Sequence, residues 1–323
     1  MKSNHHLGIN IFILNIGLFK MKIFFSHKPV SIPYGGGNQF VLNLSNYLIK
    51  QGHQVIYNLQ EGIDIIFVID GRKISNYTDY INYKKKNPKT KIILRVNECD
   101  KRKNTNIVDN LILYSIRYSD KICFVSEWLA KYFISRGFDK KKPYKSIYSG
   151  CNNTFYPVKD NKIDTTNIKI VTHHHSTHWS KGYDIYSQLD KLIDTHRFIS
   201  FTIIGKPNDK FKPINTKIIP PLKFNEIGSE LRKHDIYITA SRWEPSGNHH
   251  IEGAACGLPV LYHTDGGGIN EVCQRWGEEY RDMKTLISKL VKIVQNYEHY
   301  RRKIDYGYLS DIRSSKEFLD FMV

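Results

Sequence analysis

Short apolar runs alternate with helix-like segments along this chain, and this pattern occurs twice. The first series begins near Met21, where the apolar run 22–26 precedes an amphipathic helix predicted over 38–50. The second begins at Ile168, where a predicted strand at 168–172 precedes a helix predicted over 183–194. Alternation of strands and helices is typical of parallel sheets covered by helices on both faces. The sequence therefore predicts an α/β protein with two parallel-sheet domains.

The remaining elements follow from the same apolar patterns. Further strands are predicted at 54–58, 63–69, 91–96, 121–125 and 146–148, and then at 198–204, 217–219, 235–239 and 259–262. Further helices are predicted at 76–86, 105–118 and 127–136, and then at 225–233, 249–256 and 282–299.

A polar segment without periodicity, residues 157–167, separates the two series and predicts a linker. We expect an N-terminal domain over 21–157, a C-terminal domain over 168–299, and a helical tail over 300–323 that can cross back to the N-terminal domain. Residues 1–20 stand apart. Their apolar run, 7–19, is shorter than the roughly 20 residues that span a bilayer and lacks a small-residue cleavage site. We expect a dispensable extension or an upstream start, with a loose membrane contact as the alternative.

The composition bounds the class of protein. Hydrophobic residues make up 41% of the 323 residues, which is enough for packed cores. The five cysteines form no Cys-x-x-Cys pair, a pattern that fits a reducing compartment and a cytoplasmic location. The net charge is +17, and residues 70–145 hold 19 Lys and Arg against 8 Asp and Glu. These charges indicate either solvated surfaces or attraction to an anionic membrane or an acidic acceptor. No nucleic acid is expected, because no nucleic-acid-binding motif accompanies them.

The stretch 241–271 concentrates the polar groups of a ligand site. Glu244 and Glu252 are separated by seven residues, a predicted strand follows at 259–262, and a second glycine loop follows at 266–268. This order places polar groups at the C-terminal edge of a parallel sheet, where ligands bind. The helix start at Ser246-Gly247-Asn248-His249 can offer backbone N–H groups to an anion or to sugar hydroxyls. A carboxylate such as Glu252 suits a ribose diol. The alternative is that both glutamates are ordinary surface residues.

Two further segments suit a phosphate. Gly35-Gly36-Gly37 stands between a predicted strand and a helix, where the backbone can approach a ligand closely, although a plain tight turn gives the same pattern. Lys181 precedes Gly182 at a strand-to-helix turn, a position that suits a diphosphate, although an exposed turn lysine is the alternative.

Four histidines, His173, His174, His175 and His178, precede this lysine. Neighbouring residues of a strand point to opposite faces, so these histidines are not expected to bind a metal. We expect one or two of them to line the ligand cleft.

The motifs, taken in order, resemble one family. Glu244 to Glu252 matches the E-x7-E motif of the family-4 retaining glycosyltransferases, which have the GT-B fold. Other segments that are similar to this family occur in the expected order: MKIFFSHKP, YGGGNQFVLNLSNYLIKQGHQV, VSEWLAKYF, SIYSGCNNTFYP, KGYD, ACGLPV and DGGGINE. The resemblance covers residues 21–272, and its most specific part lies in the second domain. It implies two Rossmann-like domains that face each other across a cleft.

The resemblance also implies roles for the candidate residues. Lys181 would neutralise the leaving diphosphate, Glu252 would bind the ribose, and Glu244 with the backbone of residues 246–249 would hold the transferred sugar. Gly36 and Gly37 would close over the diphosphate. The family transfers a sugar with retention from a nucleotide diphosphate sugar, here a UDP- or GDP-sugar, which is a co-substrate. It needs no metal or other cofactor. The acceptor would be a glycan, a lipid or a protein-linked group. The basic N-terminal domain separately raises the expectation that the protein is peripheral to the inner face of a membrane.

Two positions depart from the family pattern. Ser176, with His175 beside it, stands where the family has an arginine, so His175 and Lys206 become candidates for phosphate binding. Asn97 or Glu98 stands where many members have a histidine near the sugar. Two other functions stay open: a nucleotide-sugar 2-epimerase and a non-catalytic sugar-nucleotide-binding protein. A phosphorylase would need a pyridoxal lysine site, and we identify none in the sequence.

Overall fold

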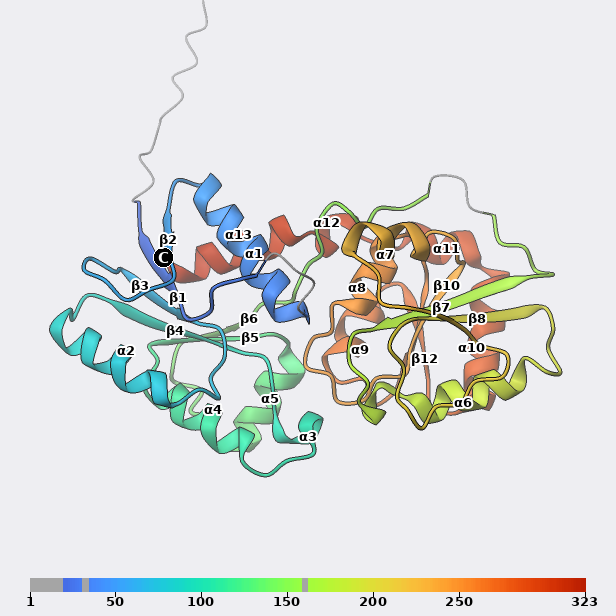
Figure 1. Cartoon of the computed structure of the whole chain (residues 1–323), viewed down its shortest axis with the longest axis horizontal. Helices are drawn as coiled ribbons and strands as arrows, with labels where there is room; N and C mark the ends of the chain where they lie inside the picture. Colours follow the sequence, from blue (N-terminus) through green and yellow to red (C-terminus); the bar gives the residue numbers. More distant parts are fainter. Residues whose placement is uncertain (1–19, 31–34, 159–161) are drawn as a thin grey trace, which may run out of the picture.

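The computed structural model describes residues 20–30, 35–158 and 162–323, which form two α/β domains set side by side (Figure 1). Each domain is built on a six-stranded sheet whose paired strands are all parallel. The predicted α/β architecture is confirmed. Apart from Lys20, the predicted N-terminal extension lies outside the described residues, and so do residues 159–161 of the predicted linker.

The sheet of the N-terminal domain has the strand order β2-β1-β3-β4-β5-β6. Its strands are β1 (Lys22–Phe25), β2 (Gln54–Ile56), β3 (Ile65–Val68), β4 (Lys91–Val96), β5 (Lys121–Phe124) and β6 (Tyr144–Ser146). The helices of this domain are α1 (Gly35–Lys50), α2 (Ser75–Lys86), α3 (Asp100–Lys103), α4 (Val108–Arg117) and α5 (Glu127–Ser135).

Both faces of this sheet are covered, because alternate strand residues point to opposite sides. Ile66 and Val68 belong to the cluster that includes the buried side chains of α2, α4 and α5. Ile65 and Phe67 belong to the opposite cluster, which contains buried side chains of α1 and of the C-terminal helix α13 (Asp311–Met322). Burial on both faces explains why these strands are nearly continuous apolar runs.

The C-terminal helix therefore packs on the N-terminal domain. The ring centroid of Phe318 lies 5.0 Å from the ring centroid of Phe40 on α1 and 5.9 Å from that of Phe67 on β3. In Figure 1, α13 runs beside α1, and the C-terminus ends at the first domain. This crossover ties the two domains together at a second place besides the linker.

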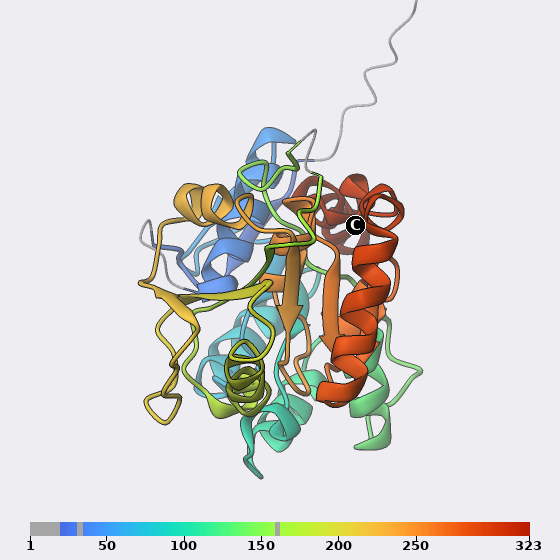
Figure 2. The same ribbon diagram turned by 90° about the vertical axis from the view of Figure 1, so that its right-hand side faces the viewer.

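The second sheet has the order β12-β11-β10-β7-β8-β9. Its strands are β7 (Ile168–His174), β8 (Ile199–Gly205), β9 (Lys217–Ile219), β10 (Ile236–Thr239), β11 (Val260–His263) and β12 (Gly277–Tyr280). Its helices are the short 3-10 helix η1 (Trp179–Lys181), α6 (Tyr183–Leu192), α7 (Phe224–Leu231), α8 (His249–Ala255), α9 (Gly268–Cys273), α10 (Met283–Gln295), α11 (Tyr297–Arg302) and α12 (Tyr306–Leu309). Side chains of α6, α10 and α11 share one apolar cluster, and those of α8, α9 and α12 share another; Figure 2 shows α10 running along the sheet.

The structure differs from the predicted elements in several places. Helix α1 begins at Gly35 instead of residue 38, so the glycines form its first turn and not a separate loop. Strand β6 spans 144–146 instead of 146–148. The helix predicted over 282–299 is two helices, α10 and α11, because the backbone of Asn296 is non-helical. Strand β12 was not predicted, because its sequence, GEEY, is polar and half-exposed at a sheet edge.

Candidate active site

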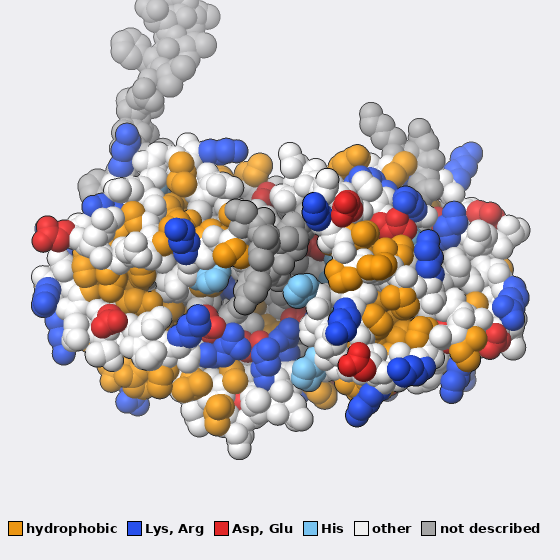
Figure 3. All heavy atoms as spheres, in the orientation of Figure 1, with side chains coloured by type: hydrophobic (Ala, Val, Ile, Leu, Met, Phe, Trp, Pro, Cys, Tyr) orange, Lys and Arg blue, Asp and Glu red, His pale blue; other side chains and the backbone are white. Residues whose placement is uncertain are grey.

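A cavity of about 350 Å³ lies between the two domains. Residues that follow β4 in the first sheet and β7 and β10 in the second line it, so the carboxyl ends of both sheets open onto the same space. Figure 3 shows histidine side chains at the boundary between the domains. Twelve of the residues that the sequence predicted for the site line this cavity: Gly36, Gly37, Asn97, Glu98, His175, Lys181, Glu244, Ser246, Gly247, Asn248, His249 and Glu252. Lys206, in contrast, is exposed and is absent from the lining.

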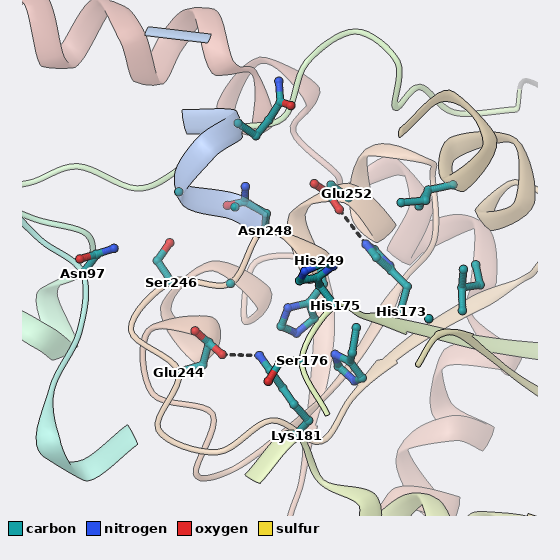
Figure 4. Close-up of a pocket in the computed structure, with 18 of the residues that line it drawn as sticks. Asn97, His173, His175, Ser176, Lys181, Glu244, Ser246, Asn248, His249 and Glu252 are labelled. Atoms are coloured by element: carbon teal, nitrogen blue, oxygen red, sulfur yellow. Dashed lines mark hydrogen bonds and ion pairs between the residues drawn. The ribbon is translucent and has the colours of Figure 1, made fainter. Parts of the chain in front are cut away.

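Lys181 is held at the turn between β7 and α6. It is the last residue of η1, and Gly182 follows with φ +93°. A Cβ atom at Gly182 would lie 2.2 Å from the Cβ of Ala240, so only glycine fits there. This close packing against the end of β10 directs the buried Lys181 toward Glu244 (Figure 4).

Glu244 is fixed by the second glycine loop. Its backbone N–H donates to the carbonyl of Gly266 at 3.1 Å, and its carbonyl accepts from the N–H of Gly268 at 2.9 Å. Gly267, between them, has φ +75°. Through these bonds, the loop at residues 266–268 holds the backbone of Glu244 in place.

The Glu244 carboxylate joins both domains. Its Oε2 lies 2.5 Å from Lys181 Nζ, and its Oε1 lies 3.1 Å from Nε of Arg102 in the N-terminal domain. Burial alone would raise the pKa of Glu244, but the charges and hydrogen bonds of Lys181 and Arg102 lower it to about 2. Glu244 is therefore ionised at neutral pH, between the buried ammonium of Lys181 and the partly buried guanidinium of Arg102.

Arg102 is a site residue that the sequence analysis missed. It comes from α3, and its Nη1 also donates to Glu98 Oε2 at 2.7 Å. Lys103 lies 3.3 Å from the same carboxylate oxygen, so Glu98 is engaged within its own domain. Glu98 precedes α3, so the four-residue spacing of helical pairs does not predict its contact with Arg102. Nothing in the sequence indicates the contact with Glu244, 142 residues away.

Glu252 makes its own buried contact on α8. Its Oε2 lies 2.7 Å from His173 Nε2, and His173 Nδ1 lies 3.1 Å from the hydroxyl of Tyr237 (Figure 4). His173 thus holds one carboxylate oxygen of Glu252 in a fixed direction. The sequence placed the histidine run near the cleft, but it gave no reason to choose His173 over its neighbours.

The other histidines of the cavity differ in environment. His174 and His249 are buried, and burial and the nearby charge of Lys181 lower the pKa of both imidazoles well below the usual value. Both are neutral at pH 7, and His249 Nε2 lies 2.9 Å from the hydroxyl of Thr239. His175 is exposed at the rim of the cavity.

The first turn of α1 faces the second domain at the cavity. A Cβ atom added to Gly36 would lie 3.2 Å from Nδ2 of Asn248, whereas one added to Gly37 would meet open space. Figure 4 shows Asn248 beside this helix end and Asn97 on the N-terminal side. Ser246 Oγ reaches Ser149 Oγ at 3.4 Å, a third contact between the two sides.

One wall of the cavity is apolar. It is formed by residues that the sequence analysis did not single out, namely Ile204, Pro221, Leu222 and Ile227. Apolar residues at strand ends and loops are indistinguishable from core residues in a sequence, so no signal pointed to them. Such a wall suits the flat face of an aromatic ring.

Two classes of feature were not found among the residues that the structure describes. In residues 20–30, 35–158 and 162–323, no group of three or more His, Cys, Asp or Glu side chains is placed to hold a metal ion. Over the same ranges, no helix combines the length and the apolar character needed to cross a bilayer.

Comparison with known proteins finds a family match in the second half of the chain. Residues 158–310 match the family model of glycosyl transferases group 1. No curated protein matches the sequence. Among solved structures, a sucrose-phosphate synthase from Thermosynechococcus elongatus has a TM-score of 0.71 at 12% identity, over 93% of this chain and 98% of that one.

Two further solved structures have the same architecture. WaaG, a glycosyltransferase involved in lipopolysaccharide biosynthesis, has a TM-score of 0.65 at 11% identity, over 94% of this chain and all (100%) of that one. HepE from Anabaena, in complex with UDP-glucose, has a TM-score of 0.62 at 15% identity, over 94% and 97% of the two chains. The chain is therefore an α/β protein of the GT-B fold, as predicted.

Proposed function

We propose that this protein is a retaining glycosyltransferase that moves a sugar from a nucleoside diphosphate sugar to a glycan, lipid or protein-linked acceptor. One observation carries the proposal. Lys181 and Glu244 of the C-terminal domain meet Arg102 of the N-terminal domain in a cavity that also contains Glu252. This cavity thus contains positive charge for a diphosphate and a carboxylate for a ribose. It also opens toward the second domain, which can hold the acceptor.

The donor is proposed to lie along the C-terminal wall. The base packs against Ile204, Leu222 and Ile227, and the ribose hydroxyls donate to the oxygen of Glu252 that His173 leaves free. The diphosphate then reaches Lys181. The complex of the structural neighbour HepE with UDP-glucose supports UDP as one nucleotide to test.

The proposed reaction needs one bond to form and one to break. The acceptor oxygen bonds to the anomeric carbon on the face that the phosphate leaves. The bond between that carbon and the phosphate oxygen breaks, its electron pair stays on the phosphate, and the acceptor proton moves to a phosphate oxygen. Negative charge therefore develops on the diphosphate, and groups already arranged around it lower the barrier.

Residues of the chain supply the positive charge in this proposal. Lys181 is a buried cation, Arg102 lies on the other side of Glu244, and the first turn of the 16-residue helix α1 presents its N-terminal end to the cavity. The buried imidazoles of His174 and His249 are neutral and add no charge. We accordingly propose that no metal or other cofactor takes part.

A thermal-shift screen tests donor binding. We expect one of UDP-, GDP-, ADP- or dTDP-sugars to raise the melting temperature. A ligand at about 100 times its Kd stabilises the native state by about 2.7 kcal/mol, which corresponds to several degrees for a chain of this size. The matching nucleoside without phosphates is the control, and it should give little or no shift. If none of the four donors raises the melting temperature, the proposal fails at its first step.

Product analysis separates the two enzymatic functions and the non-catalytic one after a donor is found. A glycosyltransferase releases nucleoside diphosphate only as fast as it glycosylates an acceptor, apart from slow hydrolysis. A 2-epimerase instead changes the sugar of the donor when no acceptor is present, and a binding protein changes nothing. Epimerised donor in acceptor-free reactions, or no turnover with an acceptor panel of glycans and lipid-linked sugars, would reject the transferase.

We further propose that the N-terminal domain contacts an anionic membrane surface. Lys84 pairs with Asp120, and Lys142 Nζ donates to the carbonyls of Arg117 and Ser119. The two lysine runs 84–86 and 140–142 therefore both lie near the start of β5, and together they form one basic surface. Lys85, Lys86, Lys140 and Lys141 of these runs are exposed.

Vesicle flotation tests this contact. Each basic residue near an anionic surface contributes about 1 kcal/mol, so the variant Lys85→Glu/Lys140→Glu should bind phosphatidylserine vesicles at least about tenfold more weakly than the wild type. The variant Lys191→Glu/Lys284→Glu changes the same charge on exposed sites of the other domain and should bind as the wild type does. Equal loss in both variants would indicate net charge alone, and an unbound wild type at low salt would reject the contact.

A further inference from the structure

Arg95 is a buried cation in the N-terminal half of the cavity. It is the penultimate residue of β4, it is 5% exposed, and it lines the cavity. Its Nε and Nη1 atoms are buried without a hydrogen-bond partner. Within the part of the chain that the structure describes, no carboxylate lies within ion-pair distance of its guanidinium.

An arginine in this state is costly for the fold. Removing a guanidinium from water without partners is strongly unfavourable, and buried polar groups in native proteins are nearly always hydrogen-bonded. The guanidinium carbon lies 4.1 Å from the ring centroid of Phe40, a cation–π contact that returns only part of this cost. Burial lowers the pKa of Arg95 to about 10, so it remains charged at neutral pH. A residue with this cost and no partner suggests a ligand as the missing partner.

The other two cations that line the cavity in the described residues already have partners. Lys181 is paired with Glu244, and Arg102 is paired with Glu244 and Glu98. Glu98, the acid nearest to Arg95 in sequence, is occupied by Arg102 and Lys103. The unused hydrogen-bond donors of Arg95 therefore remain for a group that enters from the cavity.

We propose that Arg95 forms an anion subsite that receives a phosphate or carboxylate group of the acceptor. Its planar fork of N–H donors matches the geometry of either group. We assign the subsite to the acceptor because the base, the ribose and the diphosphate already have groups of their own in the proposed function, namely the apolar wall, Glu252 and Lys181, whereas Arg95 has none. Asn97, two residues further along, lines the same side and adds an uncharged amide. This inference rests on the proposed function for the identity of the acceptor, but the anion site itself can be tested separately.

Calorimetric titration with small anions tests the subsite. Inorganic phosphate and acetate are titrated at low ionic strength into the wild type, with and without the nucleoside diphosphate chosen by the thermal-shift screen. At least one anion should bind in both conditions. Arg95→Met should weaken that binding at least tenfold, Arg95→Lys should restore part of it, and the nucleotide affinity should stay within twofold. Arg117→Met, on the exposed side of α4, is the matched control and should change neither.

The outcomes separate the two proposals. Preference for phosphate indicates a phosphorylated acceptor, and preference for acetate indicates an acidic sugar. If the wild type binds neither anion, or if Arg95→Met weakens the nucleotide and leaves anion binding intact, the subsite is rejected. If no nucleotide binds while the anion still requires Arg95, the proposed function fails and the subsite stands. The melting temperature of Arg95→Met should equal or exceed that of the wild type, because an unpaired buried charge is removed; a fall of more than a few degrees would indicate a structural role and overturn the subsite.

Discussion

Lys181→Ala is expected to lower kcat by roughly 10²- to 10³-fold, the usual effect of removing one charge-stabilising group from an active site. The ammonium group of Lys181 is buried in the cavity, where water screens its charge little. Charge on a departing diphosphate would lose this stabilisation in the variant. The measurement is the initial rate of nucleoside diphosphate release with saturating donor and acceptor, so that kcat is separated from binding.

Two controls make this result specific. Lys191→Ala removes an exposed lysine from the far end of α6 and should leave kcat unchanged. Lys181→Ala also removes one of the two cations that pair with the Glu244 carboxylate in the described residues, which should reduce stability. The double variant Lys181→Ala/Glu244→Gln removes that unbalanced charge. It should regain the melting temperature but not the rate. A rate that returned with stability would show that Lys181 acts on the fold alone, and a kcat within threefold of wild type would remove it from the reaction.

The sequence could predict the shared position of the site residues because one topological rule links them. Residues that follow the parallel strands of a sheet gather at its carboxyl edge. Lys181 and Glu244 follow two neighbouring strands, β7 and β10, and they meet although 63 residues separate them. The position of Glu252 could be predicted from the helix that was expected directly after the glycine loop. For Lys181, Glu244 and Glu252, the positions after strands along the chain were enough to predict that they share one site.

Other features depend on contacts that local patterns do not carry. Arg102 lies in a run of basic residues. In the sequence, such a run on a solvated surface cannot be distinguished from one that contains an ion pair with Glu244. Glycine is a poor helix former, so a helix that starts at Gly35 contradicts local propensity. The close approach of Gly36 to Asn248 accounts for a small residue there, but it involves the other domain. Sequence patterns therefore could not supply these particular contacts between the domains, although the family resemblance implied that the domains face each other across a cleft.

Glu252→Ala is expected to weaken donor binding by about 10- to 100-fold. A hydrogen bond to a charged group contributes about 1.5–3 kcal/mol, and each 1.4 kcal/mol is a factor of ten in affinity. His173 lies 2.7 Å from one oxygen of Glu252, which leaves the other oxygen to accept from a ribose hydroxyl. Titration of the nucleoside diphosphate into both proteins measures the loss, and melting temperatures check that the variant is folded.

The ribose itself provides the decisive control. Wild-type protein should bind the ribonucleotide more tightly than its 2′-deoxy and 3′-deoxy analogues, because those analogues lack hydroxyls that the carboxylate accepts. In Glu252→Ala this preference should disappear, since the partner of the hydroxyls is gone. His173→Phe should reduce the preference without abolishing it, because Glu252 remains but loses the contact that orients it. If Glu252→Ala still discriminates against the deoxy analogues, the carboxylate does not bind the ribose, and the donor must lie differently along the C-terminal wall.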